Sequence, residues 1–112
     1  MLGTGARMSF GTDWPVSILH PMEGIGVAVT RTVDDGPTEA WLSEECLTTP
    51  QALRIYTAGA SYQAGAEGHR GVVAPGSIAD LVWLAENPFR IAPKDLASVR
   101  VQGTWLAGGR TY

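Results

Sequence analysis

The chain has one cysteine, Cys46, among its 112 residues, so no disulfide bond can form within it. A lone cysteine fits a reducing compartment, and we expect a cytoplasmic protein. No apolar run approaches the roughly 18 residues of a membrane span, and Met1 is not followed by the basic and apolar regions of a signal peptide. The basic residues form no run and the net charge is −3. The composition therefore predicts neither a nucleic-acid partner nor a membrane partner.

The rest of the composition is that of a small globular domain. Hydrophobic residues make up 45% of the chain, which argues against disorder throughout. A chain of 112 residues can form at most one domain with a modest core. Fourteen glycines and seven prolines predict a chain rich in turns.

Residues 7–16 contain the main candidate site residue, Asp13. Residues 7–11 are typical of a short strand, and Pro15 prevents a helix directly behind Asp13 while favouring an extended Trp14. Asp13 would then lie at the end of a strand, where side chains of α/β sheets and barrels face a cleft. A carboxylate there can bind a metal or accept a proton from water. The alternative is an Asp that opens a turn, which is the commoner role of this residue on local grounds.

The first predicted helix begins at Pro21, with Met22 and Ile25 at helical spacing. Two glycines inside it weaken it by about 1 kcal/mol each relative to alanine, but they would allow close packing. His20 stands just before this helix and could face a cleft. A lone histidine in this position is more often a capping or surface residue.

The second predicted helix has a capping box, with Thr48 at the N-cap, Pro50 in the first turn and Gln51 three residues after the cap. It should end between residues 59 and 65, where glycines accumulate. Its apolar face is expected to comprise Leu53, Tyr56 and Ala60, widened by Ala52 and Ile55. An aromatic residue at helical spacing indicates a core position, so Tyr56 is given no catalytic role.

Residues 33–47 show no clear period and are predicted to form a loop. Its acidic side chains do not have the spacing of a Ca²⁺ loop and are expected to form a solvated face: Asp34, Asp35, Glu39, Glu44 and Glu45. Cys46 has no neighbouring histidine or basic group to lower its pKa, so it is interpreted as a structural thiol and not as a nucleophile.

The last third of the chain predicts turns and strands. Residues 74–77 (APGS) favour a type II turn, with Pro75 at the second corner and Gly76 where φ must be positive. Residues 78–84 form a nearly continuous apolar run, which is typical of a strand covered on both faces. A second strand is expected at residues 99–107, followed by a hairpin turn at Gly108 and Gly109.

Four stretches in this order resemble the C-terminal end of metal-dependent amidohydrolases, most closely the subgroup that contains N-substituted formamide deformylase. The resemblance runs over essentially the whole chain. The stretches are residues 11–16 (GTDWPV), 53–57 (LRIYT), 71–82 (GVVAPGSIADLV) and 101–110 (VQGTWLAGGR).

The resemblance implies an α/β fold: the last strand and helices of a (β/α)₈ TIM barrel, with strands of the associated small β-sandwich. Residues 1–66 would then belong to the barrel and residues 67–112 to the sandwich. It also implies that Asp13 contacts the divalent metal, zinc in our expectation, and takes the proton of the attacking water. The implied substrate of the intact enzyme is a small-molecule amide.

The remaining metal ligands of the family have no counterpart here. The chain has no His-x-His, only His20 and His69, and its single Lys94 lies in the wrong region for a bridging lysine. A catalytic zinc needs about three protein ligands. We therefore expect a fragment of a larger hydrolase, whose remainder is absent or encoded separately, with no bound metal and no activity alone. The second hypothesis is a non-catalytic module that self-associates, and on either hypothesis a homo-oligomer is expected because the strands lack their partners.

Overall fold

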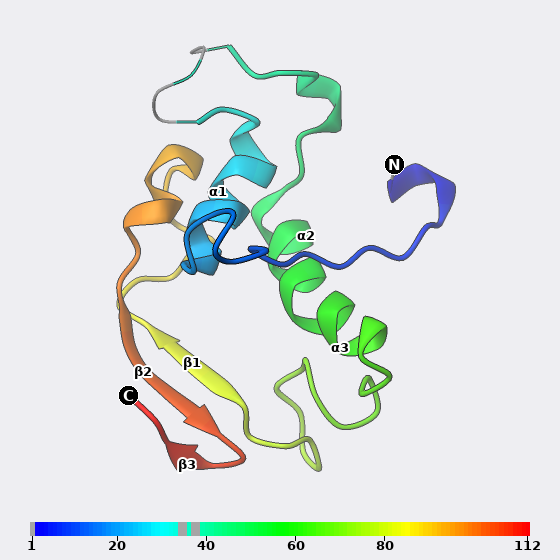
Figure 1. Cartoon of the computed structure of the whole chain (residues 1–112), viewed down its shortest axis with the longest axis vertical. Coiled ribbons are helices and arrows are strands. Elements are labelled where there is room, and N and C mark those ends of the chain that lie inside the picture. Colours follow the sequence, from blue (N-terminus) through cyan, green and yellow to red (C-terminus); the bar gives the residue numbers. More distant parts are fainter. Residues whose placement is uncertain (1, 34–35, 37–38) are drawn as a thin grey trace.

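The computed structural model describes residues 2–33, 36 and 39–112. Helical turns occupy one part of the molecule and a small antiparallel sheet occupies the other (Figure 1). The sheet has the order β1 (Leu81–Leu84), β2 (Val101–Leu106), β3 (Gly109–Arg110). The helical elements in chain order are η1 (Leu2–Thr4), α1 (Pro21–Thr30), η2 (Ser43–Glu45), α2 (Thr49–Arg54), η3 (Ile55–Gly59), α3 (Ala60–Gln63) and η4 (Pro93–Ser98).

Helix α1 confirms the first predicted helix. Pro21 occupies its first turn, where the missing N–H costs nothing, and Met22 and Ile25 are buried. The expected close packing is also present, because a Cβ added at Gly24 would lie 2.2 Å from the hydroxyl of Tyr56. Glycine at this position therefore lets the second helix approach α1.

Helix α2 begins with the predicted capping box. The N–H of Gln51 donates to Thr48 Oγ1 (3.4 Å), and the N–H of Thr48 donates to Gln51 Oε1 (2.8 Å). Two N–H groups at the helix start are thus satisfied reciprocally, which is the physical reason that this sequence pattern starts a helix.

Elements α2, η3 and α3 follow one another without a break, and the helix ends within the predicted interval, at Gln63. The π-turn η3 lies in its middle and was not predicted. Ala52 and Ile55 are the buried apolar residues, whereas Leu53 and Tyr56 pack against the core from its margin. The helix therefore buries the predicted apolar face, but the centre of this face is formed by Ala52 and Ile55 and not by Leu53 and Tyr56.

The core joins α1, α2 and the 3₁₀ segment η4. Leu96 from η4 is fully buried and Val99, just after it, is 1% exposed. Among the described residues, the buried apolar side chains are Met22, Ile25, Ala52, Ile55, Leu96 and Val99. The radius of gyration is 14.6 Å, compared with about 13 Å for a compact domain of 100 residues. The molecule is thus built loosely around a small core.

The strand predicted at residues 7–11 does not form here, because these residues are extended but pair with no described strand. A parallel barrel strand needs neighbours on both sides to satisfy its backbone groups. Here the extended segment, blue in Figure 1, instead packs against the green helix formed by α2, η3 and α3.

The turns and strands predicted near the C-terminus are present, but the strands are shorter than expected and the hairpin turn lies one residue earlier than the predicted Gly108 and Gly109. In the type II turn, Gly76 has φ +87° and the N–H of Ser77 donates to the carbonyl of Ala74 (3.1 Å). Strands β1 and β2 pair antiparallel, with Leu81 opposite Trp105. The β2–β3 hairpin closes through a two-residue turn at Ala107 and Gly108, both of which have positive φ.

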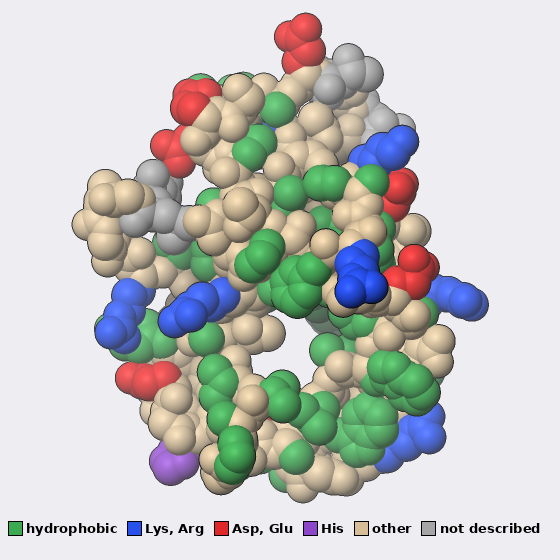
Figure 2. All heavy atoms as spheres, turned by 180° about the vertical axis from the view of Figure 1, so that it is seen from behind, with side chains coloured by type: hydrophobic (Ala, Val, Ile, Leu, Met, Phe, Trp, Pro, Cys, Tyr) green, Lys and Arg blue, Asp and Glu red, His purple; other side chains and the backbone are tan. Residues whose placement is uncertain are grey.

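The prediction that residues 78–84 are covered on both faces is wrong. Val82 and Trp83 are 55% and 58% exposed, since no second layer packs on the three-stranded sheet within the described residues. Figure 2 shows hydrophobic side chains gathered around a central hollow and over the end of the molecule that carries the sheet. The sheet thus exposes large apolar side chains that a covering layer would normally bury.

The predicted loop at residues 33–47 contains one short 3₁₀ segment, η2, and is otherwise irregular in its described part. Asp34 and Asp35 lie outside the described residues, so the arrangement predicted for them stays a prediction. Cys46 is a free, half-buried thiol. None of the helices in the described part of the chain combines the length and apolar character needed to cross a bilayer.

Candidate functional site

Asp13 lies in a tight turn that follows the extended segment. Its carbonyl accepts a hydrogen bond from the N–H of Val16 (2.9 Å), and its φ of +51° is in the left-handed region that Asp and Asn tolerate. The Trp14–Pro15 peptide bond inside the turn is cis. The side chain of Asp13 is exposed, so a carboxylate is presented to solvent at the start of the turn.

A groove of about 440 Å³ opens beside this turn. Phe10 to Thr12 and Ser17 line it on one side, and the start of α1 and Tyr56 line it on the other. Asp13 lies in the turn between Thr12 and Ser17, which both line the groove. Asp13 itself is not among the described residues that line it. The candidate carboxylate is therefore near the groove in sequence without facing into it.

Two of the residues that line the groove, His20 and Tyr56, have partly buried polar groups. His20 is the N-cap residue of α1, as its position predicted, but its side chain makes no capping hydrogen bond. Its Nδ1 atom is buried and has no hydrogen-bond partner among the described residues. Burial raises the pKa of the Tyr56 phenol, so this hydroxyl remains a hydrogen-bond donor at neutral pH.

The described part of the chain was also compared with the requirements of a metal site. Within residues 2–33, 36 and 39–112, no three His, Cys, Asp or Glu side chains come together as a possible metal site. Asp13 is a single exposed carboxylate. His69 is also exposed, and it follows the second helix in the sequence. Catalytic zinc takes about three protein ligands, and these residues do not bring such a set together.

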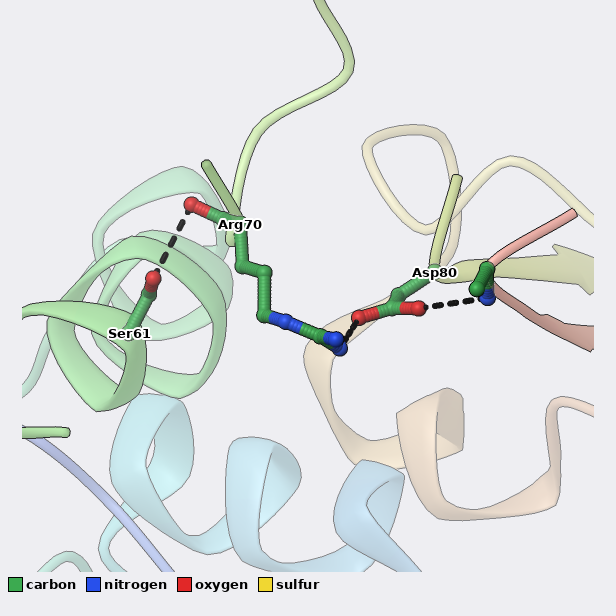
Figure 3. Close-up of polar contacts among 4 residues, drawn as sticks. Ser61, Arg70 and Asp80 are labelled. Atoms are coloured by element: carbon green, nitrogen blue, oxygen red, sulfur yellow. Dashed lines mark hydrogen bonds and ion pairs between the residues drawn. The ribbon is translucent and has the colours of Figure 1, made fainter. Parts of the chain in front are cut away.

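A polar chain connects the end of the second helix to the sheet (Figure 3). The hydroxyl of Ser61 donates to the carbonyl of Arg70 (3.0 Å), and the Arg70 guanidinium forms an ion pair with Asp80. The other carboxylate oxygen of Asp80 accepts the N–H of Ala107 (2.8 Å) in the hairpin turn. Asp80 therefore links the helical part of the molecule to the β2–β3 turn.

Comparison with known proteins identifies the family. All of residues 1–112 match the model of the amidohydrolase family. The chain belongs to the amidohydrolase family. The family predicted from the four sequence stretches is thus confirmed.

Three relatives of this amidohydrolase chain match it over its whole length. It is 32% identical to Protein LONG AFTER FAR-RED 3 of Arabidopsis thaliana, 30% to the putative amidohydrolase YtcJ of Bacillus subtilis, and 31% to N-substituted formamide deformylase of Arthrobacter pascens. The alignments cover 100% of this chain but only 19%, 21% and 20% of the respective relatives. The chain thus spans about one fifth of the length of these curated relatives. No solved structure matches it.

The four stretches that resemble amidohydrolases occupy distinct places in the fold. Residues 11–16 form the Asp13 turn, residues 53–57 lie in the second helix, and residues 71–82 lead through the type II turn into β1. Residues 101–110 form the β2–β3 hairpin. The bridging role of Asp80 was not predicted, although an acidic residue directly before an apolar strand was a signal that its carboxylate needs a partner.

Proposed function

We propose that the chain is the C-terminal part of a metal-dependent hydrolase that cleaves non-peptide, amide-type carbon–nitrogen bonds, and that it is inactive alone. The observation that carries this proposal is the family match over all 112 residues, combined with coverage of only about one fifth of each relative. One of those relatives is named N-substituted formamide deformylase. The proposed substrate of the intact enzyme is accordingly a small-molecule amide.

The proposed architecture of the intact enzyme is a (β/α)₈ barrel with a small β-sandwich. Residues 1–66 would supply the last barrel strand and its helices, and residues 67–112 would supply sandwich strands. Two features support this assignment: residues 7–11 are extended and adjoin a helix, and the sheet of residues 81–110 has an open apolar face. In a barrel, the missing neighbouring strands would give residues 7–11 their hydrogen-bond partners.

Asp13 is proposed as the residue of this chain that takes part in the reaction. Its exposed carboxylate follows the segment assigned to the last barrel strand, and catalytic groups of such barrels lie at the C-terminal ends of strands. An ionised carboxylate there can accept the proton of an attacking water and return it to the leaving nitrogen. The divalent metal of the intact enzyme, zinc in this proposal, would be held mainly by residues outside the chain.

Metal analysis of the isolated chain tests this division of ligands. We expect purified wild-type chain to retain no zinc beyond adventitious binding after dialysis and to hydrolyse no amide, because one carboxylate does not hold a catalytic zinc. The Asp13→Ala variant should give the same metal content as wild type. Retention of roughly one zinc ion per wild-type chain, lost in Asp13→Ala, would contradict the proposal.

A second candidate function, a non-catalytic module that self-associates, is favoured by the open sheet. Val82, Trp83 and Leu106 are 55%, 58% and 60% exposed. Edge strands and large apolar side chains in this arrangement recruit another chain. The same surface would be covered by sandwich strands if the chain were joined to the rest of a hydrolase.

We expect the isolated chain to form a homodimer or larger assembly at micromolar concentration, measured by light scattering. Trp83→Lys should shift it towards the monomer, because a charge on β1 opposes strand pairing and apolar contact. Trp41→Lys is the matched control, since Trp41 is also exposed but lies outside the sheet. A compact wild-type monomer, or equal effects of the two variants, would argue against association through the sheet.

A further inference from the structure

The extended segment before the Asp13 turn lies along the second helix in the opposite direction. At its beginning, the Arg7 guanidinium stands 4.1 Å from the ring centre of Tyr62 in α3. At its end, the rings of Phe10 and Tyr56 meet edge to face, with centroids 5.5 Å apart and planes at 65°. Residues 7–10 are thus aligned on one face of the helix over about two of its turns.

The closest approach in this alignment is at Gly59, the last residue of the π-turn. A Cβ added at Gly59 would lie 2.2 Å from the carbonyl oxygen of Met8 and 3.4 Å from the Cα of Ser9. Both contacts are to backbone, which cannot move aside as the end of a flexible side chain can. Ser9 also donates a hydrogen bond to the Gln63 side chain one turn further along. Glycine is therefore the residue that allows the segment to lie against the helix at this point.

Two hollows adjoin the segment. A hollow of about 470 Å³ adjoins its beginning, lined by Arg7 and Met8 among others, and the 440 Å³ groove adjoins its end at Phe10. The segment is also outside the described sheet. The contacts with η3 and α3 therefore set how far the segment lies from the helix.

We propose that Gly59 is a positioning residue for Asp13: the absence of a side chain at Gly59 sets how closely residues 7–10 approach the helix, and hence where the following turn places the Asp13 carboxylate. Only two residues separate Phe10 from Asp13, so we expect a displacement of the segment to move the turn as well. This inference rests on the role of Asp13 in the proposed function. The inference adds that the catalytic role of Asp13 depends on Gly59, a residue of the helix that is remote from the carboxylate.

Gly59→Ala in the hydrolase that contains the chain is the test. Relief of the 2.2 Å contact requires a displacement of about 1 Å, and a misplacement of this size costs about 10²-fold in rate. We expect kcat to fall by about this factor with KM nearly unchanged. A purely structural role predicts a loss of stability from the same contact, with an unchanged kcat for the enzyme that remains folded. Gly68→Ala is the matched control, since a Cβ there meets nothing within 4 Å.

Nuclear Overhauser contacts between the Phe10 and Tyr56 rings in the 112-residue chain give a second readout that does not depend on activity. They should weaken in Gly59→Ala and persist in Gly68→Ala, while contacts between Met22 and Leu96 in the core remain in both. Ring contacts that persist in Gly59→Ala would overturn the proposal. Wild-type kcat in Gly59→Ala despite lost ring contacts would also overturn it, provided that Asp13→Asn is inactive.

The two proposals fail in different ways. Full activity of Asp13→Asn would refute the catalytic role of Asp13 and with it the positioning role, whatever the ring contacts show. If Gly59→Ala does not fold, Phe10→Ala takes its place, because it removes the ring contact nearest Asp13 without placing a Cβ against backbone. A kcat for Phe10→Ala within twofold of wild type would then refute the positioning role.

Discussion

Asp13→Asn in the complete hydrolase is expected to reduce turnover by about 10²–10⁴-fold, the usual contribution of a general acid–base. The amide of asparagine cannot accept a proton at neutral pH. Folding should be unaffected for two reasons visible in the turn. The Asp13 side chain is exposed, and asparagine tolerates its φ of +51° as well as aspartate does.

Steady-state kinetics with a small amide substrate measure this effect. Asp95→Asn is the matched control, because it makes the same chemical change at an exposed carboxylate in η4. Turnover of Asp13→Asn within a few-fold of wild type would reduce Asp13 to the turn-opening role that its local sequence also allows. A loss shared equally by Asp95→Asn would point to a general charge effect and not to proton transfer.

Leu96→Ala is expected to lower the free energy of unfolding by about 2–5 kcal/mol, the range for deleting a buried leucine side chain. Leu96 is completely buried against α1, where it meets Met22 and Ile25. The loss is large relative to the roughly 5–15 kcal/mol that stabilises a typical domain. Because the core is small, few other side chains can move in to fill the cavity.

Urea denaturation followed by circular dichroism measures this change. Leu19→Ala serves as the control, since Leu19 is 69% exposed and such surface substitutions change stability by about 0.5 kcal/mol or less. A decrease below about 1 kcal/mol for Leu96→Ala would contradict the importance of the η4–α1 contact. If the isolated chain associates, both variants are compared at one protein concentration, because association adds to apparent stability.

Features encoded in a few neighbouring residues were predictable from the sequence. Thr48 and Gln51 specify a helix start by themselves, and Pro75 with Gly76 specifies a turn. The strand at residues 7–11 was not predictable in the same way, because a strand depends on partners and this chain does not supply them. The π-turn η3 was not predicted, because a single π-turn inside an α-helix leaves no distinct pattern of residue types in the sequence.

The candidate site was predictable only in part. Asp13 could be singled out because Pro15 limits the backbone around it, but a strand end and a turn remained open, and the structure has Asp13 in a turn. Its chemical role stays a prediction. The contacts that join Asp80 to Ala107, 27 residues apart, and Gly59 to Met8 depend on tertiary packing. No local pattern contains that information.

The bridge between Arg70 and Asp80 has a mechanical consequence. The segment that connects α3 to β1 contains Gly65, Gly71 and Gly76, all with positive φ, so it bends at several points. The ion pair that restrains it is partly open to solvent, with side chains 42% and 28% exposed, and salt weakens such pairs. Higher ionic strength is therefore expected to weaken the link that Asp80 makes between this connector and the β2–β3 turn.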